Sequence, residues 1–447
     1  MFKYIPHTDA DIKEMLDKIG VGSIDELFSE IPEEVKKRAE YNLEPALSEL
    51  EGRKRLSCLA GMNKPLVSFC GAGAYDVYTP SVIPYLTSRQ EFLTSYTPYQ
   101  PEIAQGTLQY IFEFQSMICE LTGMDVSNAS VYDGATATVE AMLMAVSHTK
   151  RNAVLVSGAV NPRTIAALKT YASFRSVELR IIAAKDYGTD VSALKAGLTG
   201  DVAAVIVQNP NFFGYVEDYE DLAGAVKDNG SLLIMNVDPS TLSVLKTPGE
   251  IGADIACGDG QTLGIPLSFG GPYVGFIAAN KALLRKMPGR ICGMTTDVDG
   301  KRAFVLTLQA REQHIRREKA TSNICSNQSL MALHTVIYMS IMGKAGLVEV
   351  ANRAAANTHY LYEGLLKTNL FKKVTDRPFF KEFVLRVSAD IGALRDYLAE
   401  KGFLFGYDLG QVGPEHENEI LLCATETRTK AEIDELLAKV EEYAHVR

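Results

Sequence analysis

The chain has 447 residues, of which 47% are hydrophobic and 22% are charged, and this balance is that of an ordinary soluble protein with two or three domains. Its formal net charge of −10 disfavours a nucleic-acid partner, because an acidic surface repels a phosphate backbone. No apolar run reaches the ~20 residues needed to span a bilayer, and the amino terminus lacks secretory and transit-peptide patterns. We therefore predict no membrane contact and a cytoplasmic location.

The spacing of cysteines and histidines argues against a metal site and against a disulfide framework. The seven cysteines are scattered without a CxxC pair, and the seven histidines show neither HxxxH nor HExxH spacing. We predict no metal site, and free thiols fit a reduced cytoplasm.

Residues 1–65 are predicted to form a polar helical arm. Ser23 and Glu26 make a capping-box pattern, and Pro32 followed by two glutamates marks a second helix start. Because the segment has too few large apolar residues for a core of its own, we expect it to pack on another surface.

A tyrosine-rich and proline-rich segment, FLTSYTPYQPEIAQG, covers residues 92–106. Pro98 and Pro101 exclude a regular helix there. A long loop of this kind is more often a binding surface than a linker, and the alternative is a packed crossover with buried tyrosines. Tyr96, Tyr99 and Gln100 could hydrogen-bond a phosphate or a carboxylate.

Apolar residues then recur at helical spacing from residue 105 to Gly123, which suits a helix end. Residues 128–147 read as a turn followed by a buried helix. Small residues and hydroxyls at its start, including Gly134 and Thr136, make a candidate anion site for a phosphate. The alternative is a helix cap with close packing.

A run of β–α units follows and predicts a mostly parallel sheet with helices on both faces. No GxGxxG motif follows the first strand, which disfavours a dinucleotide fold. Asp238 ends one strand at the edge where pyridoxal enzymes place an acid against the pyridine nitrogen, although it could instead cap the turn through Pro239. The strands are expected at residues 153–157, 177–183, 202–208 and 231–236, with helices at 162–173 and 218–229.

The segment 254–278, DIACGDGQTLGIPLSFGGPYVGFIA, reads as strand, polar loop, double-glycine turn and strand. In one large class of α/β folds, such a loop carries the lysine that binds pyridoxal phosphate as a Schiff base. This loop has no lysine, and Gln261 stands near that place. Lys246 and Lys281 are the nearest lysines, and both lie outside the loop.

A charged helix is predicted over residues 308–319, with Glu312 and Arg316 paired at i and i+4, and with Arg311 and His314 on one face. A charge run of this kind is more often a solvated face than a site.

The pattern changes near residue 326. Helical stretches at 327–342 and 345–366 lead to strand, helix, strand and helix at 379–387, 391–401, 420–425 and 430–445. Thr429 and Glu432 form a capping box for the last helix. We therefore predict a large α/β domain over 66–326 and a smaller α+β domain over 327–447.

Four long phrases together resemble the P-protein of the glycine cleavage system, and specifically the amino-terminal half of that family's full-length form. They are SYTPYQPEIAQGTLQ (residues 95–109), NASVYDGATATVEAM (128–142), GADIACGDGQTLGIPLSFGGPYVGF (252–276) and LQAREQHIRREKATSNIC (308–325). The resemblance is strong over residues 60–335 and weaker beyond.

The resemblance implies an aspartate-aminotransferase-like, fold type I pyridoxal-phosphate enzyme fold. It also implies that the chain is the first, α, subunit of a split enzyme. Pyridoxal phosphate would then sit on the second, β, subunit, bound to the lysine of a His-Lys pair. The corresponding positions here are Gly260 and Gln261, and a glutamine amide cannot form a Schiff base. We expect the enzyme to be a heterotetramer. We expect this chain to be inactive on its own.

The family reaction decarboxylates glycine with pyridoxal phosphate and passes the aminomethyl group to the lipoyl arm of H-protein, with T-protein and L-protein in the same system. For this reaction we assign three groups of candidate residues, from the chemistry of the side chains and the shape of the loops. The shared-site loop is Tyr96, Tyr99, Gln100 and Glu102; the vestigial cofactor pocket is Gly134, Thr136, Asp238 and Gln261; and the anion or partner contacts are Arg311, His314, Arg316 and Arg317.

Two other functions stay open at this point. The chain could be an independent pyridoxal enzyme of another reaction class that uses Lys246 or Lys281, or it could be a scaffold subunit that only stabilises its partner.

Overall fold

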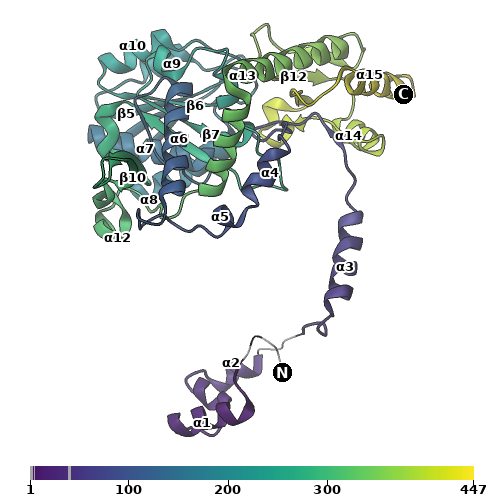
Figure 1. Ribbon diagram of the computed structural model, residues 1–447. Coiled ribbons are helices and arrows are strands. Elements are labelled where there is room, and N and C mark those ends of the chain that lie inside the picture. The colour runs from purple at the N-terminus through teal and green to yellow at the C-terminus, as the bar shows by residue number, and fades with distance from the viewer. Residues whose placement is uncertain (1–3, 5, 39–41, 447) are drawn as a thin grey trace. The chain divides into compact units, whose positions relative to one another are not determined.

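The computed structural model describes Tyr4, residues 6–38 and residues 42–446, and it divides into two compact units, Met1–Lys64 and Pro65–Arg447 (Figure 1). In the first unit, Thr8 and Ser48 cap helices through reciprocal hydrogen bonds, and Ser23 caps a short 3₁₀ helix as predicted. None of its described helices holds a buried residue. They are α1 (Asp9–Ile19), η1 (Ile24–Phe28), α2 (Glu33–Arg38) and α3 (Glu49–Gly61).

A seven-stranded sheet in the order β2-β8-β7-β6-β5-β3-β4 forms the centre of the second unit. Its strands are parallel except β8, which runs antiparallel to both of its neighbours. The predicted β–α alternation is therefore confirmed. The strands are β2 (Val126–Ser127), β3 (Ala153–Ser157), β4 (Glu178–Ile182), β5 (Val202–Asn209), β6 (Leu232–Val237), β7 (Ile255–Asp259) and β8 (Gly275–Ala279).

Two apolar cores cover the two faces of this sheet, because alternate residues of each strand point to opposite sides. Leu155, Val205 and Met235 face one core, and Val156, Ile206 and Ile234 face the other. The first core takes residues from α6 (Gln105–Thr122), α9 (Val191–Ala196), α10 (Glu220–Asp228), α11 (Pro248–Ile251) and α4 (Val82–Thr87). The second takes residues from α7 (Gly134–Thr149) and α8 (Pro162–Arg175).

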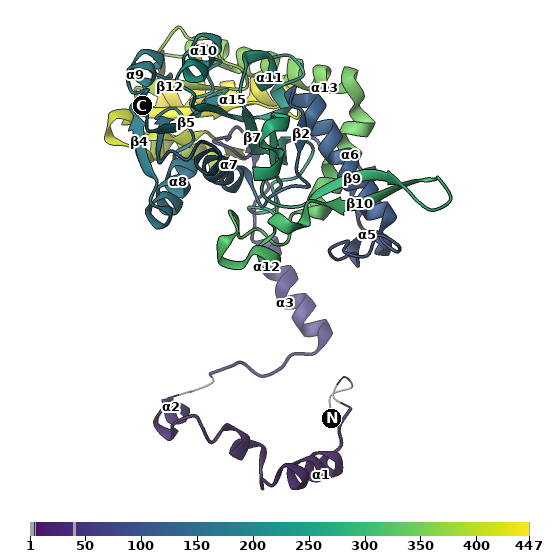
Figure 2. The ribbon, with the colours of Figure 1, turned by 90° about the vertical axis from the view of Figure 1, so that its left-hand side faces the viewer.

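Strands β9 (Ile291–Thr296) and β10 (Arg302–Thr307) form an antiparallel hairpin whose tip extends beyond the helices (Figure 2). Gln105 joins the start of α6 to this hairpin, since its amide exchanges two hydrogen bonds with the backbone of Phe304 at 2.8 and 2.9 Å. The end of the tyrosine-rich loop is thereby fixed. Helix α5 (Gln90–Leu93) and the short strand β1 (Val67–Ser68) precede it in the chain.

The prediction of one charged helix over residues 308–319 is wrong. The segment is broken into η5 (Gln309–Arg311), α12 (Gln313–Arg316) and η6 (Arg317–Lys319), and Arg317 has a positive φ of 54°. Glu312 turns inward to Arg290 and His314 instead of pairing with Arg316. Tertiary contacts of a buried carboxylate therefore override the local charge pattern.

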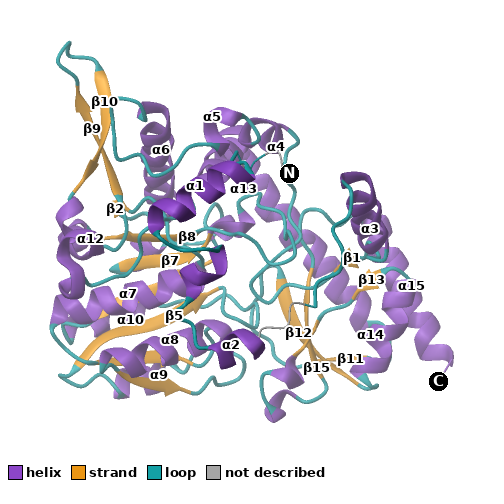
Figure 3. Cartoon of the chain, turned by 90° about the horizontal axis from the view of Figure 1, so that it is seen from below, coloured by secondary structure: helices purple, strands orange, loops and turns teal. Residues whose placement is uncertain are grey.

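A four-stranded antiparallel sheet, β11-β12-β15-β14, has its own core and lies apart from the large sheet (Figure 3). Thr429 and Glu432 form the predicted capping box of α15. The elements are β11 (Phe371–Lys373), β12 (Glu382–Val387), α14 (Ile391–Glu400), β13 (Phe403–Leu404), β14 (Tyr407–Asp408), β15 (Glu419–Cys423) and α15 (Lys430–Val446), with 3₁₀ turns η2 (Pro239–Thr241), η3 (Gly260–Thr262), η4 (Lys281–Lys286), η7 (Leu409–Gln411) and η8 (Pro414–His416) elsewhere in the unit.

Helix α13 (Ser329–Leu366) joins the two sheets. Val336 and Tyr338 in its first half belong to a core of the large sheet, whereas Leu361 and Leu365 belong to the core of the small sheet. Gly343, with φ of 57°, breaks the helix between them, at the predicted gap. Helix α13 is long and apolar enough to cross a membrane, but the core helix of a soluble protein can have the same length and composition.

Candidate functional site

A cavity of about 440 Å³ opens at the carboxyl ends of β5, β6 and β7, the edge where α/β folds bind ligands. Three of the four predicted pocket residues, Gly134, Asp238 and Gln261, line it, and Thr136 follows in the same helix turn. The other described lining residues are Gly71–Tyr75, Asp133, Ala135, Asn161, Arg163, Thr164, Gln208, Asn236, Val237, Asp259, Thr262 and Tyr407.

Gln261 is fully buried, and its amide is saturated by the backbone of neighbouring loops. Its Nε2 donates to the carbonyls of Tyr75 and Ile265 at 2.8 and 2.6 Å, and its Oε1 accepts the Tyr75 N–H at 3.0 Å. The side chain therefore joins the loop at residues 71–75 to the loop after β7. An amide in this position offers no nucleophilic amine.

Asp238 follows β6 and forms a buried ion pair with Lys381, which sequence reasoning did not single out. The carboxylate also accepts hydrogen bonds from the Thr262 hydroxyl at 2.7 Å and from Ser240 N–H and Oγ at 3.0 and 2.8 Å. Burial raises the pKa of Asp238, but the Lys381 ammonium and these donors outweigh it and hold the pKa below its usual value.

Lys381 is held charged in the same way. Burial lowers the pKa of its ammonium, but the Asp238 carboxylate more than compensates and raises it above the usual value. Its Nζ lies 3.8 Å from the ring centroid of Tyr75 and 3.2 Å from Ser240 Oγ. A charged lysine with these partners is not poised to act as a nucleophile.

The start of α7, predicted as an anion site, is already occupied by carboxyl groups of the chain. Gly134 N–H donates to Asp259 at 3.0 Å, and Thr136 N–H donates to its cap residue Asp133 at 2.7 Å. Asp259 also accepts the Gln261 N–H at 2.9 Å. A Cβ added at Gly134 would lie 2.7 Å from the Asp259 nitrogen, so glycine is required for this approach.

Two buried acids beside the cavity titrate near neutrality. Burial raises the pKa of Asp259 to about 7, against hydrogen bonds from Gly134 and Gln261, and the carboxylates of Asp133 and Asp238 raise it further. Burial also raises the pKa of Glu382 to about 7, although Ala72 N–H at 2.6 Å, the Tyr75 hydroxyl at 2.7 Å and Lys381 favour its charged form.

We expect the free energy of unfolding to fall as the pH rises from about 6 to about 8. The folded pKa of Asp259 is about 7 against an ordinary 3.8, so at pH values between the two the unfolded chain releases a proton that the folded chain keeps. The free energy of unfolding therefore falls as the pH rises through this window, and the fall is complete by about pH 8. Asp259→Asn should flatten the profile by about 1.4 kcal/mol over this range. Denaturant unfolding at several pH values measures it. The exposed Asp299→Asn is the control, and identical profiles for both variants would contradict the assignment.

The predicted shared-site loop meets the predicted basic segment at Arg290. This guanidinium is 2% exposed, donates to the Tyr99 hydroxyl at 3.1 Å and lies over the Tyr99 ring at 5.3 Å. Its Nε has no hydrogen-bond partner and lies 4.0 Å from Glu312, which is 3.5 Å from His314 Nδ1. The His314 ring packs edge-on against Tyr99.

The remaining predicted residues of these two groups differ in their surroundings. Tyr96 is 76% exposed, and Gln100, Glu102, Arg316 and Arg317 are also exposed. Arg311 instead donates to the carbonyls of Met287, Gly289 and Leu308, so its guanidinium serves the chain's own backbone. The loop itself walls a second cavity of about 560 Å³. The structure thus brings Tyr99 and His314 together, holds Arg311 against the backbone and leaves the others exposed.

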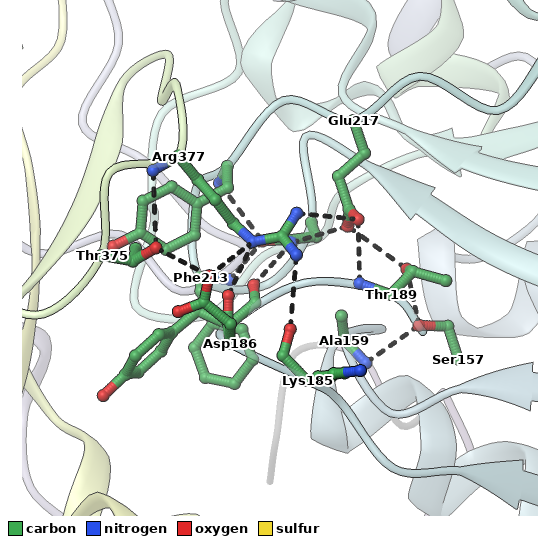
Figure 4. A network of polar contacts seen from close by, with 12 residues as sticks. Ser157, Ala159, Lys185, Asp186, Thr189, Phe213, Glu217, Thr375 and Arg377 are labelled. Atoms are coloured by element: carbon green, nitrogen blue, oxygen red, sulfur yellow. Dashed lines mark hydrogen bonds and ion pairs between the residues drawn. The ribbon is translucent and has the colours of Figure 1, made fainter. Parts of the chain in front are cut away.

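A polar network around the buried carboxylate of Glu217 ties the loop after β5 to the segment that precedes β12 (Figure 4). Glu217 accepts from Thr189 N–H at 2.8 Å and from Asn211 at 2.8 Å, and Arg377 lies 3.7 Å from its carboxylate. Arg377 also donates to the Asp186 carbonyl at 2.7 Å. These contacts hold the segment that carries Lys381 against the large sheet.

Solved structures that share little sequence with this chain establish its fold. A glutamate decarboxylase from Lactobacillus brevis superposes with a TM-score of 0.69 at 11% identity, over 91% of this chain and 94% of that chain. A sphingosine-1-phosphate lyase from Burkholderia pseudomallei gives 0.66 at 12% identity, over 91% and 92%. The chain has the aspartate-aminotransferase-like, type I fold of pyridoxal-phosphate enzymes, as predicted.

Closer relatives identify the family. The profile described as "Glycine cleavage system P-protein" matches residues 2–440. A "probable glycine dehydrogenase (decarboxylating) subunit 1" from Moorella thermoacetica is 53% identical, over 97% of this chain and 98% of its own length. One from Anoxybacillus flavithermus is 50% identical, over 99% of each. The crystal structure of a glycine decarboxylase (P-protein), in inhibitor-bound form, has a TM-score of 0.90 at 42% identity, over 99% of this chain and 100% of that chain. The chain belongs to the glycine cleavage system P-protein family.

Sequence reasoning missed four residues that shape the two sites: Tyr75, Asp259, Arg290 and Lys381. Asp259 lies two positions before Gln261 in the predicted loop, and this position could have identified it as a site residue. Lys381 and Arg290 stand far along the chain from their partners, and no local pattern pairs them.

Proposed function

We propose that the chain is the subunit of a glycine-decarboxylating P-protein that carries no cofactor lysine and completes the active site of a partner, subunit 2. One observation carries this proposal. Gln261, in the loop where this fold places the cofactor lysine, is buried with both ends of its amide bonded to backbone.

Pyridoxal phosphate, held by the partner subunit, would supply the electron sink for loss of the glycine carboxylate as CO₂. The aminomethyl group would then pass to the lipoyl arm of H-protein, with T-protein and L-protein acting in the same system. We place this system in the cytoplasm and expect two copies of each subunit.

This chain's part is to position and shield. Tyr96 and Gln100 are exposed on a loop that is anchored at Tyr99 by Arg290 and at Gln105 by the hairpin. An exposed hydroxyl on a fixed loop can hydrogen-bond a carboxylate or a phosphate in a partner's site at little entropic cost. Arg316 and Arg317 would offer cationic contacts, and His314 a hydrogen-bonding ring, at the same edge of the molecule.

Lys246 and Lys281, the two lysines that an independent pyridoxal enzyme could use, do not reach the pocket. Lys246 pairs with Glu220, and its side chain is 60% exposed, whereas Lys281 is exposed at the start of η4. Neither lines the cavity that holds Gln261. An independent pyridoxal enzyme that uses either lysine is therefore disfavoured.

Tyr96→Phe should lower glycine turnover by about 10- to 100-fold in the complex reconstituted with subunit 2, because a hydrogen bond to a charged group is worth about 1.5–3 kcal/mol. The measurement is glycine-dependent release of CO₂ at saturating lipoylated H-protein, with the assembled fraction followed by size-exclusion chromatography. Assembly should be unchanged. Tyr171→Phe, on α8, is the matched control. Full turnover by Tyr96→Phe would favour the scaffold role.

A further inference from the structure

We propose that the cavity beside Gln261 excludes pyridoxal phosphate altogether, because the chain's own side chains occupy the three places where this fold holds the cofactor. The proposal rests on the proposed function only for the assignment of the cofactor to the partner. It goes further, because loss of one lysine removes a covalent bond and still leaves a pocket that could bind the cofactor without it.

The first place is that of the ring nitrogen. In pyridoxal enzymes an acid at the position of Asp238 pairs with the protonated pyridine. Here the Lys381 ammonium pairs with that carboxylate, and the hydroxyl of Thr262 and the N–H and Oγ of Ser240 take further hydrogen bonds. A pyridinium would have to displace a buried ammonium and leave it without its counterion, which is strongly unfavourable.

The second place is that of the phosphate, at the amino end of α7. The backbone N–H groups of Gly134 and Thr136 already donate to the carboxyl groups of Asp259 and Asp133. A phosphate dianion would have to displace both hydrogen bonds and then lie beside two acids. Among the described residues that line the cavity, Arg163 is the one cationic side chain, and it is exposed.

The third place is that of the lysine. Gln261 fills it, and two of its three hydrogen bonds hold the loop at Tyr75, while the third goes to the carbonyl of Ile265. The ring of Tyr75 lies under the Lys381 ammonium, and the Tyr75 hydroxyl donates to Glu382 at 2.7 Å. The substitutes therefore contact one another, so they work as one interlocked set.

This set also ties the two sheets together. Lys381 and Glu382 stand at the start of β12 in the small sheet, and their partners Asp238, Ala72 and Tyr75 surround the large-sheet cavity. The Glu217–Arg377 network fastens the same segment from its other side. The residues that displace the cofactor thus cross-link the walls that a cofactor would otherwise hold.

The test measures cofactor binding by the purified full-length chain, without any assay of turnover. Equilibrium dialysis against pyridoxal 5′-phosphate and the ³¹P resonance of the cofactor report binding, and borohydride reduction followed by peptide mass spectrometry locates a covalent adduct. We expect less than a tenth of an equivalent bound to the wild-type chain, an unshifted ³¹P resonance and no pyridoxyl-lysine. Stoichiometric binding, or an adduct on Lys381, would overturn the proposal.

Two variants separate an occupied pocket from the absence of a lysine. Gln261→Lys alone should still bind less than a tenth of an equivalent, because Asp238 and the start of α7 stay engaged. If this variant turns yellow with one equivalent bound, the missing lysine was the only barrier and the proposal fails. Gln261→Lys combined with Lys381→Met should bind at least tenfold tighter than Gln261→Lys. No gain in a double variant with a wild-type circular dichroism spectrum would refute the role of Lys381.

These outcomes are independent of the proposed function. The complex could lose turnover in Tyr96→Phe whether or not this pocket binds the cofactor, and a chain that binds it could still complete its partner's site. The two proposals therefore stand or fall on separate readouts.

Discussion

Lys381→Met is expected to lower the free energy of unfolding by about 3–5 kcal/mol, because it leaves the Asp238 carboxylate buried without its counterion. Equilibrium unfolding in guanidinium, followed by circular dichroism, measures the loss. Methionine keeps the length and packing of the side chain, so the lost charge dominates the change.

Two companions make the comparison specific. Lys430→Met removes an exposed ion pair with Asp434 and should leave the free energy of unfolding close to that of the wild type. Asp238→Asn combined with Lys381→Met removes both charges and should recover more than half of the loss. If Lys381→Met is no more destabilising than Lys430→Met, the pair does not hold the pocket together.

Arg290→Met should lower the free energy of unfolding by about 3 kcal/mol. It should also reduce the turnover of the reconstituted complex by at least about tenfold. It leaves the buried Glu312 carboxylate without its nearest cation and removes the donor that holds the Tyr99 hydroxyl. Thermal unfolding of the chain measures stability, and CO₂ release by the complex measures turnover. Both are needed, because the loop would lose its anchor even at temperatures where the chain stays folded.

Arg302→Met is the matched control, since Arg302 is exposed on the hairpin and lies over the Phe304 ring. Arg290→Lys keeps the charge and should restore stability more than turnover, because an ammonium cannot reproduce the fork that reaches both Tyr99 and Asn327. A variant that loses stability yet assembles and turns over normally would separate Arg290 from the function of the loop.

The large sheet was predictable because its signals are local. Apolar runs such as Val202–Asn209 are buried on both faces, and caps such as Gly123, with φ of 70°, announce helix ends in the sequence. The break at Gly343 was equally visible. The single helix predicted over residues 308–319 was wrong, because the backbone path there depends on the burial of Glu312 against Arg290. No local sequence pattern identifies Arg290 as the partner of Glu312.

The candidate site divides along the same line. The positions of Gly134, Asp238 and Gln261 followed from the order of strands, since strand ends of a parallel sheet meet at one edge. The contacts of those residues did not follow from the strand order. The sequence pattern at Gly134 predicts a phosphate, whereas in the structure its N–H donates to Asp259. The partner of Asp238 is Lys381, which immediately precedes β12 and lies more than a hundred residues later in the chain.

The Lys381–Asp238 pair bears on how such a subunit is maintained in a cell. An enzyme that binds pyridoxal phosphate gains stability from the free vitamin B6 cofactor, so its folded population follows nutrient supply. On our proposal that the internal ion pair takes the cofactor's place, this chain has no such linkage. Its abundance would then be uncoupled from vitamin status, and under B6 shortage it would outlast any partner whose fold depends on the cofactor.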